Sequence, residues 1–205
     1  MPFLLLLSNR VSKLIGNISK VFVSYPFHFL FPKKRFTIPV HSKALFKGKK
    51  QKIQKNIWQT NYSNKVSLPI YLNYLFNRLM SLSYNYHYVS TEDRLIFIKK
   101  NASNEIVKAY ERLNDGAAQA DVWRLLVLQH LGGVYIDIDA HLIYPLSGII
   151  KKSDKELLIL KGTENAHTNY FIAMEKNHPI LSKAINIILE NINNDKVLGV
   201  FSLTG

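Results

Sequence analysis

One segment, residues 117–142, constrains the fold more than any other part of the chain, because its hydrophobic period changes across two glycines. From Ala117 to Leu131 the apolar residues recur at helical intervals, which predicts a buried helix. Gly132-Gly133 then supplies the positive-φ stop that ends a helix. From Val134 to Asp139 apolar and polar side chains alternate, which predicts a strand with one apolar face and one polar face.

The chain before this segment also alternates between the two periods. The sequence predicts a strand from Ile53 to Trp58, a helix from Leu68 to Leu82 and a strand from Tyr84 to Val89. A helix is expected from Thr91 to Lys99, with Thr91 as its N-cap and an acidic first turn. This order indicates an α/β layered sheet. The 205 residues suit one such domain, and the absence of cysteine excludes disulfides and zinc-thiolate sites.

The polar face of the predicted strand carries two carboxylates, Asp137 and Asp139. Residues i and i+2 of a strand point the same way, about 6.6 to 6.8 Å apart, so both side chains can converge on one ion. Hard oxygen ligands suit Mn²⁺ or Mg²⁺, which typically binds one or two carboxylates together with the oxygens of a diphosphate. An Asp-x-Asp pattern is also frequent by chance, so the two carboxylates alone do not establish a metal site.

Asp121 and Arg124 lie three residues apart on the preceding helix and therefore share one face. In that arrangement Asp121 can accept sugar hydroxyls and Arg124 can bind phosphate. A plain intrahelical salt bridge is the alternative, and it is the more common use of such a pair.

The first 91 residues carry all of the excess positive charge. They contain 14 of the 27 Lys and Arg and none of the 14 Asp and Glu. Residues 1–50, which we expect to form a separate basic and aromatic segment, suit the anionic face of a membrane, although neither apolar run in it is long enough to span a bilayer. A basic face that only maintains solubility is the alternative. Nucleic acid is not an expected partner, because the stretch has no RNP-type motif, zinc-finger spacing or recognition helix.

The combination of Asp121-x-x-Arg124 with Gly132-Gly133-Val134-Tyr135-Ile136-Asp137-Ile138-Asp139 resembles the signature of glycosyltransferase family 32. That family includes the fungal initiating α-1,6-mannosyltransferase and bacterial capsule and lipopolysaccharide sugar transferases. The resemblance extends from about Ile53 to Gly205. It implies a GT-A-type nucleotide-binding sheet flanked by helices, over residues 51–205, and a retaining hexosyltransferase that uses Mn²⁺ or Mg²⁺ and a UDP- or GDP-sugar.

The resemblance also implies site residues. Asp139 would ligate the metal directly, Asp137 would contact the ribose and the metal, and Asp121 and Arg124 would hold the donor sugar as catalytic residues. The predicted nucleotide-sugar site comprises Trp58, Gln59, Asp121, Arg124, Gly133, Tyr135, Asp137 and Asn169, and the predicted metal ligands are Asp137 and Asp139.

Two features depart from the family pattern. Gln54 and Trp58 stand where the family usually has proline and histidine, and Phe201–Gly205 resembles the start of a segment that continues toward further metal-site and acceptor residues. We therefore expect the domain to lack its C-terminal part and to be weakly active. The expected acceptor is an oligosaccharide or lipid-linked glycan, and the expected location is the cytoplasmic face of a bacterial inner membrane, or the Golgi lumen in a eukaryote.

Two other classes of function remain open from the residues alone. A glycoside hydrolase would use Asp137 and Asp139 as acid and base, but such pairs usually come from separate elements. A non-catalytic protein that binds membranes or nucleic acid would depend on the basic N-terminal region and ignore nucleotide sugars.

Overall fold

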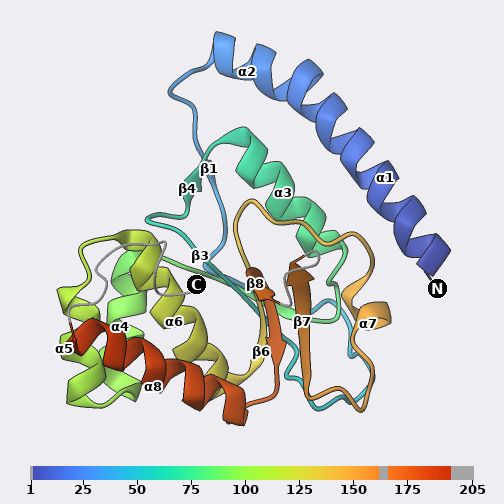
Figure 1. Ribbon diagram of the computed structural model, residues 1–205. Coiled ribbons are helices and arrows are strands. Elements are labelled where there is room, and N and C mark those ends of the chain that lie inside the picture. The colour runs from blue at the N-terminus through green and yellow to red at the C-terminus, as the bar shows by residue number, and fades with distance from the viewer. Residues whose placement is uncertain (1, 162–165, 195–205) are drawn as a thin grey trace.

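The computed structural model describes residues 2–161 and 166–194, and the predicted continuation at Phe201–Gly205 lies outside them. Its centre is a six-stranded mixed sheet in the order β2-β5-β3-β6-β8-β7, with a separate two-stranded sheet formed by β1 and β4 (Figure 1). The strands are β1 (Phe36–Thr37), β2 (His41–Ser42), β3 (Asn56–Thr60), β4 (Lys65–Val66), β5 (Asn85–Val89), β6 (Gly133–Ile136), β7 (Glu156–Lys161) and β8 (Ala166–Met174). The α/β prediction is confirmed.

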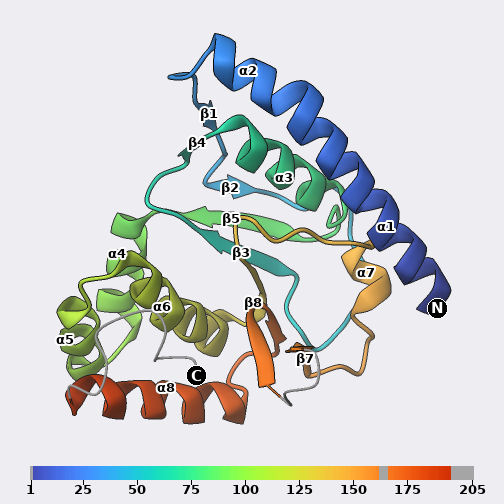
Figure 2. The same cartoon turned by 45° about the horizontal axis from the view of Figure 1, so that its top comes forward.

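Helices cover both faces of the main sheet, as the two views show (Figures 1 and 2). One face packs against α3 (Leu68–Leu79) and the short α7 (Leu146–Ile149); the other packs against α4 (Thr91–Asn101), α5 (Asn104–Arg112), α6 (Gly116–Leu131) and α8 (Pro179–Asn193). The helices predicted from Leu68, Thr91 and Ala117 are therefore present, although Ser90, not Thr91, caps α4, because the Ser90 hydroxyl accepts from the Asp93 amide.

The strand side chains alternate between two hydrophobic cores. Ile57, Val134 and Ile136 belong to the core beneath α3, whereas Trp58 and Tyr135 belong to the core beneath α6 and α8. The expectation that β6 has one polar face is wrong, because helices bury this strand on both sides. The first strand is also displaced: it runs over Asn56–Thr60 rather than from Ile53 to Trp58.

The parallel part of the sheet defines where a ligand can bind. β3 pairs in parallel with β5 on one side and with β6 on the other. The chain therefore leaves β3 first toward β5 and later returns to the opposite neighbour. In open α/β sheets the crevice at such a reversal, beyond the carboxyl ends of the strands, is where ligands bind.

The N-terminal region runs beside this body as a long rod (Figure 2). It consists of α1 (Pro2–Ile18), a π-helical stretch η1 (Ser19–Ser24) and α2 (Tyr25–Leu30), and none of these helices was predicted from the sequence. No helix in the described part of the chain is both long and apolar enough to cross a bilayer. The chain then enters the folded body, where β2 pairs with β5 as the edge of the main sheet.

Candidate active site at the carboxyl edge of the sheet

A cleft of about 880 Å³ lies at the carboxyl ends of β3 and β6. Its walls come from the residues after β3, the first turns of α4 and α6, the turn after β6, and Asn169 of β8. The volume is within the usual range for small-molecule sites, about 300 to 1,000 Å³. The amino ends of two helices open into it, so its floor favours negative charge.

The two predicted metal ligands both line this cleft, but they do not lie on a strand. β6 ends at Ile136, and residues 137–139 form a turn beyond it. The strand-spacing argument is therefore wrong in its geometry, although Asp137 and Asp139 reach the same cleft. The strand ends early because its neighbour β3 pairs with it only as far as Tyr135, which leaves the later backbone without a parallel partner.

Side-chain amides hold this turn by hydrogen bonds to its backbone carbonyls, in place of the strand-to-strand hydrogen bonds with β3 that end at Tyr135. Asn73 Nδ2 donates to the carbonyls of Ile138 (2.8 Å) and Ala140 (2.9 Å), and Asn77 Nδ2 donates to the same Ala140 carbonyl at 2.9 Å. Gln59 Nε2 donates to the Asp137 carbonyl at 3.1 Å. Gln59 is thus a support for the turn rather than part of the cleft wall.

Asp121 and Arg124 form the buried wall of the cleft. The Arg124 guanidinium lies 2.5 Å from the Asp121 carboxylate, and the two residues are only 6% and 4% exposed. Burial raises the pKa of the Asp121 carboxyl, while the charge of Arg124 acts in the opposite direction. The expected salt bridge is therefore present, but it faces a cleft instead of the solvated side of a helix.

Arg124 also connects the pair to the Asp-x-Asp turn. Its Nη1 donates to the Asn169 carbonyl at 2.6 Å and lies 3.7 Å from the Asp137 carboxylate. Its guanidinium carbon lies 4.4 Å from the centre of the Tyr135 ring. The Tyr135 hydroxyl donates to the Asp137 carboxylate at 2.6 Å, and burial raises the pKa of that hydroxyl. The structure thus brings Asp121, Arg124, Tyr135, Asp137 and Asn169 into one hydrogen-bonded group.

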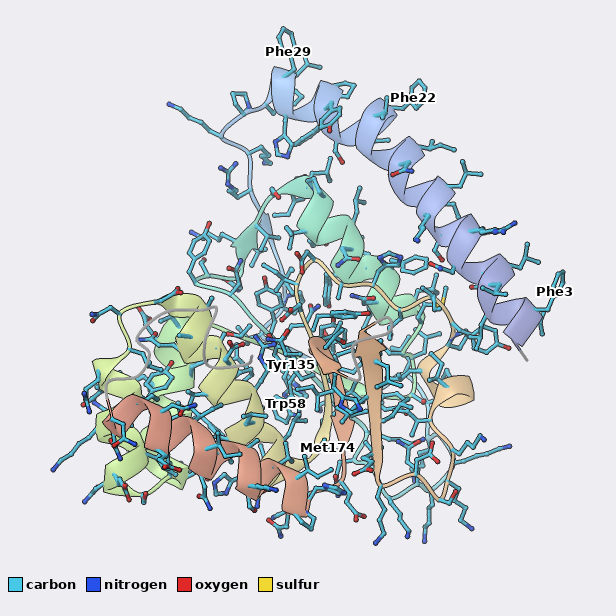
Figure 3. All side chains as sticks on the ribbon, viewed as in Figure 1. Phe3, Phe22, Phe29, Trp58, Tyr135 and Met174 are labelled. Atoms are coloured by element: carbon cyan, nitrogen blue, oxygen red, sulfur yellow. The ribbon has the colours of Figure 1, made fainter. Side chains whose placement is uncertain are left out.

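Trp58 and Gly133 do not line the cleft. The Trp58 ring stacks on His87 with centroids 4.2 Å apart, its Nε1 donates to the Gly132 carbonyl, and Figure 3 shows it among the side chains between the sheet and the helices. Trp58 is thus engaged in the core beside the cleft, and its contact with a nucleotide stays a prediction. Gly133 has a φ of 115°, and a Cβ there would lie 2.5 Å from the Asn56 carbonyl oxygen. Its role is the close approach of β6 to β3.

Arg94 is a cleft residue that the sequence analysis missed. It is 2% exposed and donates to the Gly116 carbonyl and the Thr91 hydroxyl, and its Nε has no partner among the described residues. Burial lowers the pKa of its guanidinium, and among the described residues no carboxylate pairs with it. A buried cation of this kind is costly unless an anion joins it. The signal in the sequence was a cation near the start of a helix, where the dipole disfavours it.

The donor set fits a hard divalent cation that is completed by a substrate. Within the described residues no cluster of three or more acidic or histidine side chains could hold a metal unaided. Two carboxylates line the cleft at its turn, however, and Mg²⁺-type ions commonly take one or two carboxylates with substrate phosphates supplying the remaining oxygens. The cleft therefore suits a metal that arrives with a phosphorylated ligand.

Comparisons with known proteins agree with this geometry. Residues 69–156 match the model of a glycosyltransferase sugar-binding region containing DXD motif. The solved structure of PaToxG glycosyltransferase superposes with a TM-score of 0.61 at 19% identity, over 96% of this chain and 76% of that one, and so shares its fold.

Two curated toxins are similar over shorter stretches. Toxin Afp18 of Yersinia ruckeri is 32% identical over 97 residues, which is 43% of this chain and 4% of the toxin. A toxin of Photorhabdus asymbiotica is 34% identical over 86 residues, which is 38% of this chain and 3% of that protein. The chain thus spans a small fraction of the curated proteins it matches. The predicted resemblance to DXD-containing glycosyltransferases is confirmed over residues 69–156, and the structural match confirms the predicted fold.

Proposed function

The chain carries a DXD-containing glycosyltransferase region, and we propose that it transfers a hexosyl group from a UDP- or GDP-sugar with the help of Mn²⁺ or Mg²⁺. The observation that carries this proposal is the composition of the cleft. Two buried guanidinium groups, Arg94 and Arg124, stand beside the acidic turn of Asp137 and Asp139 in one concave site. Cations and a metal-binding turn together suit a diphosphate, whereas a neutral glycan needs neither.

Each wall of the cleft then has a role. Asp137 and Asp139 would hold the metal, which when bound stabilises the charge that grows on the departing diphosphate. Arg124 orients Asp137 through its contact with the carboxylate, and the Tyr135 hydroxyl holds the same carboxylate from the strand side. Arg94 supplies an unshared positive charge for a donor phosphate. Asp121, fixed by Arg124, accepts hydrogen bonds from hydroxyls of the donor sugar.

We propose that transfer retains the anomeric configuration. The acidic residues of the described cleft are Asp121, Asp137 and Asp139, and the first is locked to Arg124 while the other two form the metal turn. None of them is placed as a covalent nucleophile. In a front-face displacement the bond from the anomeric carbon to the phosphate oxygen breaks, the bond to the acceptor oxygen forms on the same face, and the acceptor proton passes to the departing phosphate.

Two acceptors can be distinguished. The resemblance to capsule and lipopolysaccharide transferases favours a glycan, which is our first proposal. The similar stretches in two proteins named as toxins favour an acceptor outside the cell's own envelope, which is the second. Incubation with a labelled nucleotide sugar and either lipid-linked glycans or a eukaryotic protein extract separates them, because the label enters only one pool.

The donor and the metal are tested together by thermal unfolding with UDP- and GDP-sugars, with and without Mn²⁺. A ligand at 100 times its Kd stabilises a protein by about 2.7 kcal/mol, which corresponds to about 5 to 10 °C for a chain of this size. Asp139→Asn should abolish the metal-dependent part of the shift, and Asp154→Asn, outside the cleft, should not change it. A stabilisation that ignores both nucleotide and Mn²⁺, with release of sugar from a glycan, would support a hydrolase instead.

A further inference from the structure

The rod formed by α1, η1 and α2 has its polarity reversed relative to an ordinary surface helix. Phe3, Phe22 and Phe29 point away from the body, and they are 72%, 73% and 87% exposed (Figure 3). The outward side of α1 continues with apolar residues that are all about half exposed or more: Leu4, Leu7, Val11, Leu14, Ile15 and Ile18. The face that should be covered is therefore the face turned outward.

The side of α1 that lies toward the body carries Leu5 and several small polar residues. Ser8 and Ser12 are both partly buried, and they lie one helical turn apart. The Ser8 hydroxyl donates to the Ile143 carbonyl of the folded domain. Farther along the rod, Ser24 is buried and the Phe27 ring lies 5.6 Å from that of Phe36. The rod is thus held through small polar contacts and one aromatic group, while its apolar arc has no cover in the described structure.

Charge identifies the surface that this arc fits. No acidic residue occurs before Glu92, and Arg10 and Lys13 lie on α1 itself, beside the apolar arc. An apolar arc of this length with basic residues at its border is the pattern of a helix that lies in the plane of an anionic membrane. A protein partner with an apolar groove would not require the acid-free sequence on this side.

A second basic feature adjoins the rod. A hollow of about 780 Å³ is lined by six lysines, Lys47, Lys49, Lys50, Lys55, Lys151 and Lys152, with no acidic residue among its lining side chains. Tyr144, which also lines the hollow, directly follows Ile143, the residue that accepts the hydrogen bond from Ser8. The lysine hollow therefore begins one residue from the point where the body-facing side of α1 contacts the domain, and neither the rod nor the hollow lines the donor cleft.

We infer that α1 to α2 is an interfacial anchor: it lies flat in the surface of an anionic bilayer with its apolar arc among the acyl chains, and the lysine hollow receives a phosphate headgroup. The rod does not cross the membrane, since none of the described helices is long and apolar enough to do so. The anchor places the glycosyltransferase domain at the lipid surface without using any residue of the cleft.

The test is flotation of the 205-residue chain with vesicles of phosphatidylcholine alone or of phosphatidylcholine with about 30 mol % phosphatidylglycerol, which gives an anionic surface. Binding should require the anionic lipid and weaken as salt is raised. Leu7→Glu/Leu14→Glu should reduce partitioning by more than about ten-fold, because both leucines leave the apolar arc. Ile187→Glu on α8 is the matched control, since Ile187 is exposed to the same 48% as Leu7 but lies on the far helix.

The lysine hollow is tested separately with Lys151→Gln/Lys152→Gln. Each basic residue near an anionic surface contributes about five-fold to partitioning, so loss of both lysines should weaken partitioning about twenty-five-fold. Lys100→Gln/Lys108→Gln, two exposed lysines on α4 and α5, should bind vesicles like the parent chain. An unchanged thermal shift with nucleotide sugars would show that all four variants keep the folded cleft, so failure of the anchor is distinct from failure of the enzyme proposal.

Three outcomes would overturn the inference. The first is equal binding to neutral and anionic vesicles at all salt concentrations. The second is loss of binding in the Ile187 control as large as in the leucine variant. The third is a dimer in sedimentation velocity that Leu7→Glu/Leu14→Glu dissociates, with no vesicle binding by the parent chain, because the apolar arc would then cover a second copy.

Discussion

Replacing Arg94 by methionine should separate the energetics of folding from those of ligand binding. Methionine keeps the aliphatic stem and most of the buried volume but removes the charge. The parent guanidinium is 2% exposed, makes hydrogen bonds to the Gly116 carbonyl (3.2 Å) and the Thr91 hydroxyl (2.9 Å), and has no carboxylate partner in the described structure. Its loss therefore removes a costly buried charge together with two favourable contacts.

The two effects nearly cancel in the free energy of unfolding. Hydrogen bonds that involve a charged group contribute about 1.5 to 3 kcal/mol each, and burying one ion costs several kcal/mol. Arg94→Met should thus change the free energy of unfolding by less than about 2 kcal/mol. Arg124→Met should lower it by about 3 to 5 kcal/mol, because it leaves the Asp121 carboxylate buried and unpaired.

Arg94 should contribute much more to the affinity for the nucleotide sugar than to the stability of the fold. If its guanidinium meets a donor phosphate, the lost charged hydrogen bond weakens the affinity for the nucleotide sugar by about ten- to a hundred-fold. Urea unfolding measures the first quantity, and isothermal titration with the nucleotide sugar that shifts the Tm measures the second. An Arg94→Met protein destabilised by more than about 3 kcal/mol, with its affinity unchanged, would refute this reasoning.

Three further changes test other parts of the structure. Tyr135→Phe removes the hydroxyl that orients Asp137, so Mn²⁺ affinity in a titration should fall by about ten-fold or more while the fold is kept. Burial and the nearby His41 lower the pKa of His87 from 6.5 to about 4, so as the pH falls the unfolded chain takes up a proton at this histidine before the folded chain does. The free energy of unfolding, measured by urea titration, should therefore drop by about 2 kcal/mol from about pH 7.5 to about pH 4.5. His87→Gln should reduce that drop. Gly133→Ala should destabilise the chain by more than about 2 kcal/mol because its φ is 115° and the Asn56 carbonyl blocks a Cβ, whereas Gly16→Ala on open helix α1 should not.

The sequence was most informative where local pattern and tertiary role coincide. Helical spacing of apolar residues predicted α3 and α6, and the structure buries α6 around most of its circumference. The resemblance to glycosyltransferase family 32 implied one site for Asp121, Arg124 and the Asp-x-Asp pair, and all four residues line the same cleft. The family resemblance, rather than the residues alone, connected Tyr135 and Asn169 to the same cleft.

The errors arose where the outcome depends on distant neighbours. The end of β6 is set by how far β3 accompanies it, which alternation along one strand does not encode. The family resemblance implies that Trp58 lines the nucleotide pocket, but in the structure its ring stacks on His87 and its Nε1 donates to the Gly132 carbonyl. Arg94 was overlooked because the acidic residues before it make an ordinary helix start, and only the packing of α4 against α6 buries it.

The amide supports of the Asp-x-Asp turn have a consequence for how the enzyme can vary. Asn73 and Asn77 belong to α3, and Gln59 belongs to β3, so the position of Asp137 and Asp139, the proposed metal ligands, is specified by residues that do not line the cleft. These hydrogen bonds hold the turn without a donor, so the free energy of donor binding does not have to offset the entropic cost of ordering the turn. Selection on α3 can therefore tune turnover while every residue that meets the substrate stays the same.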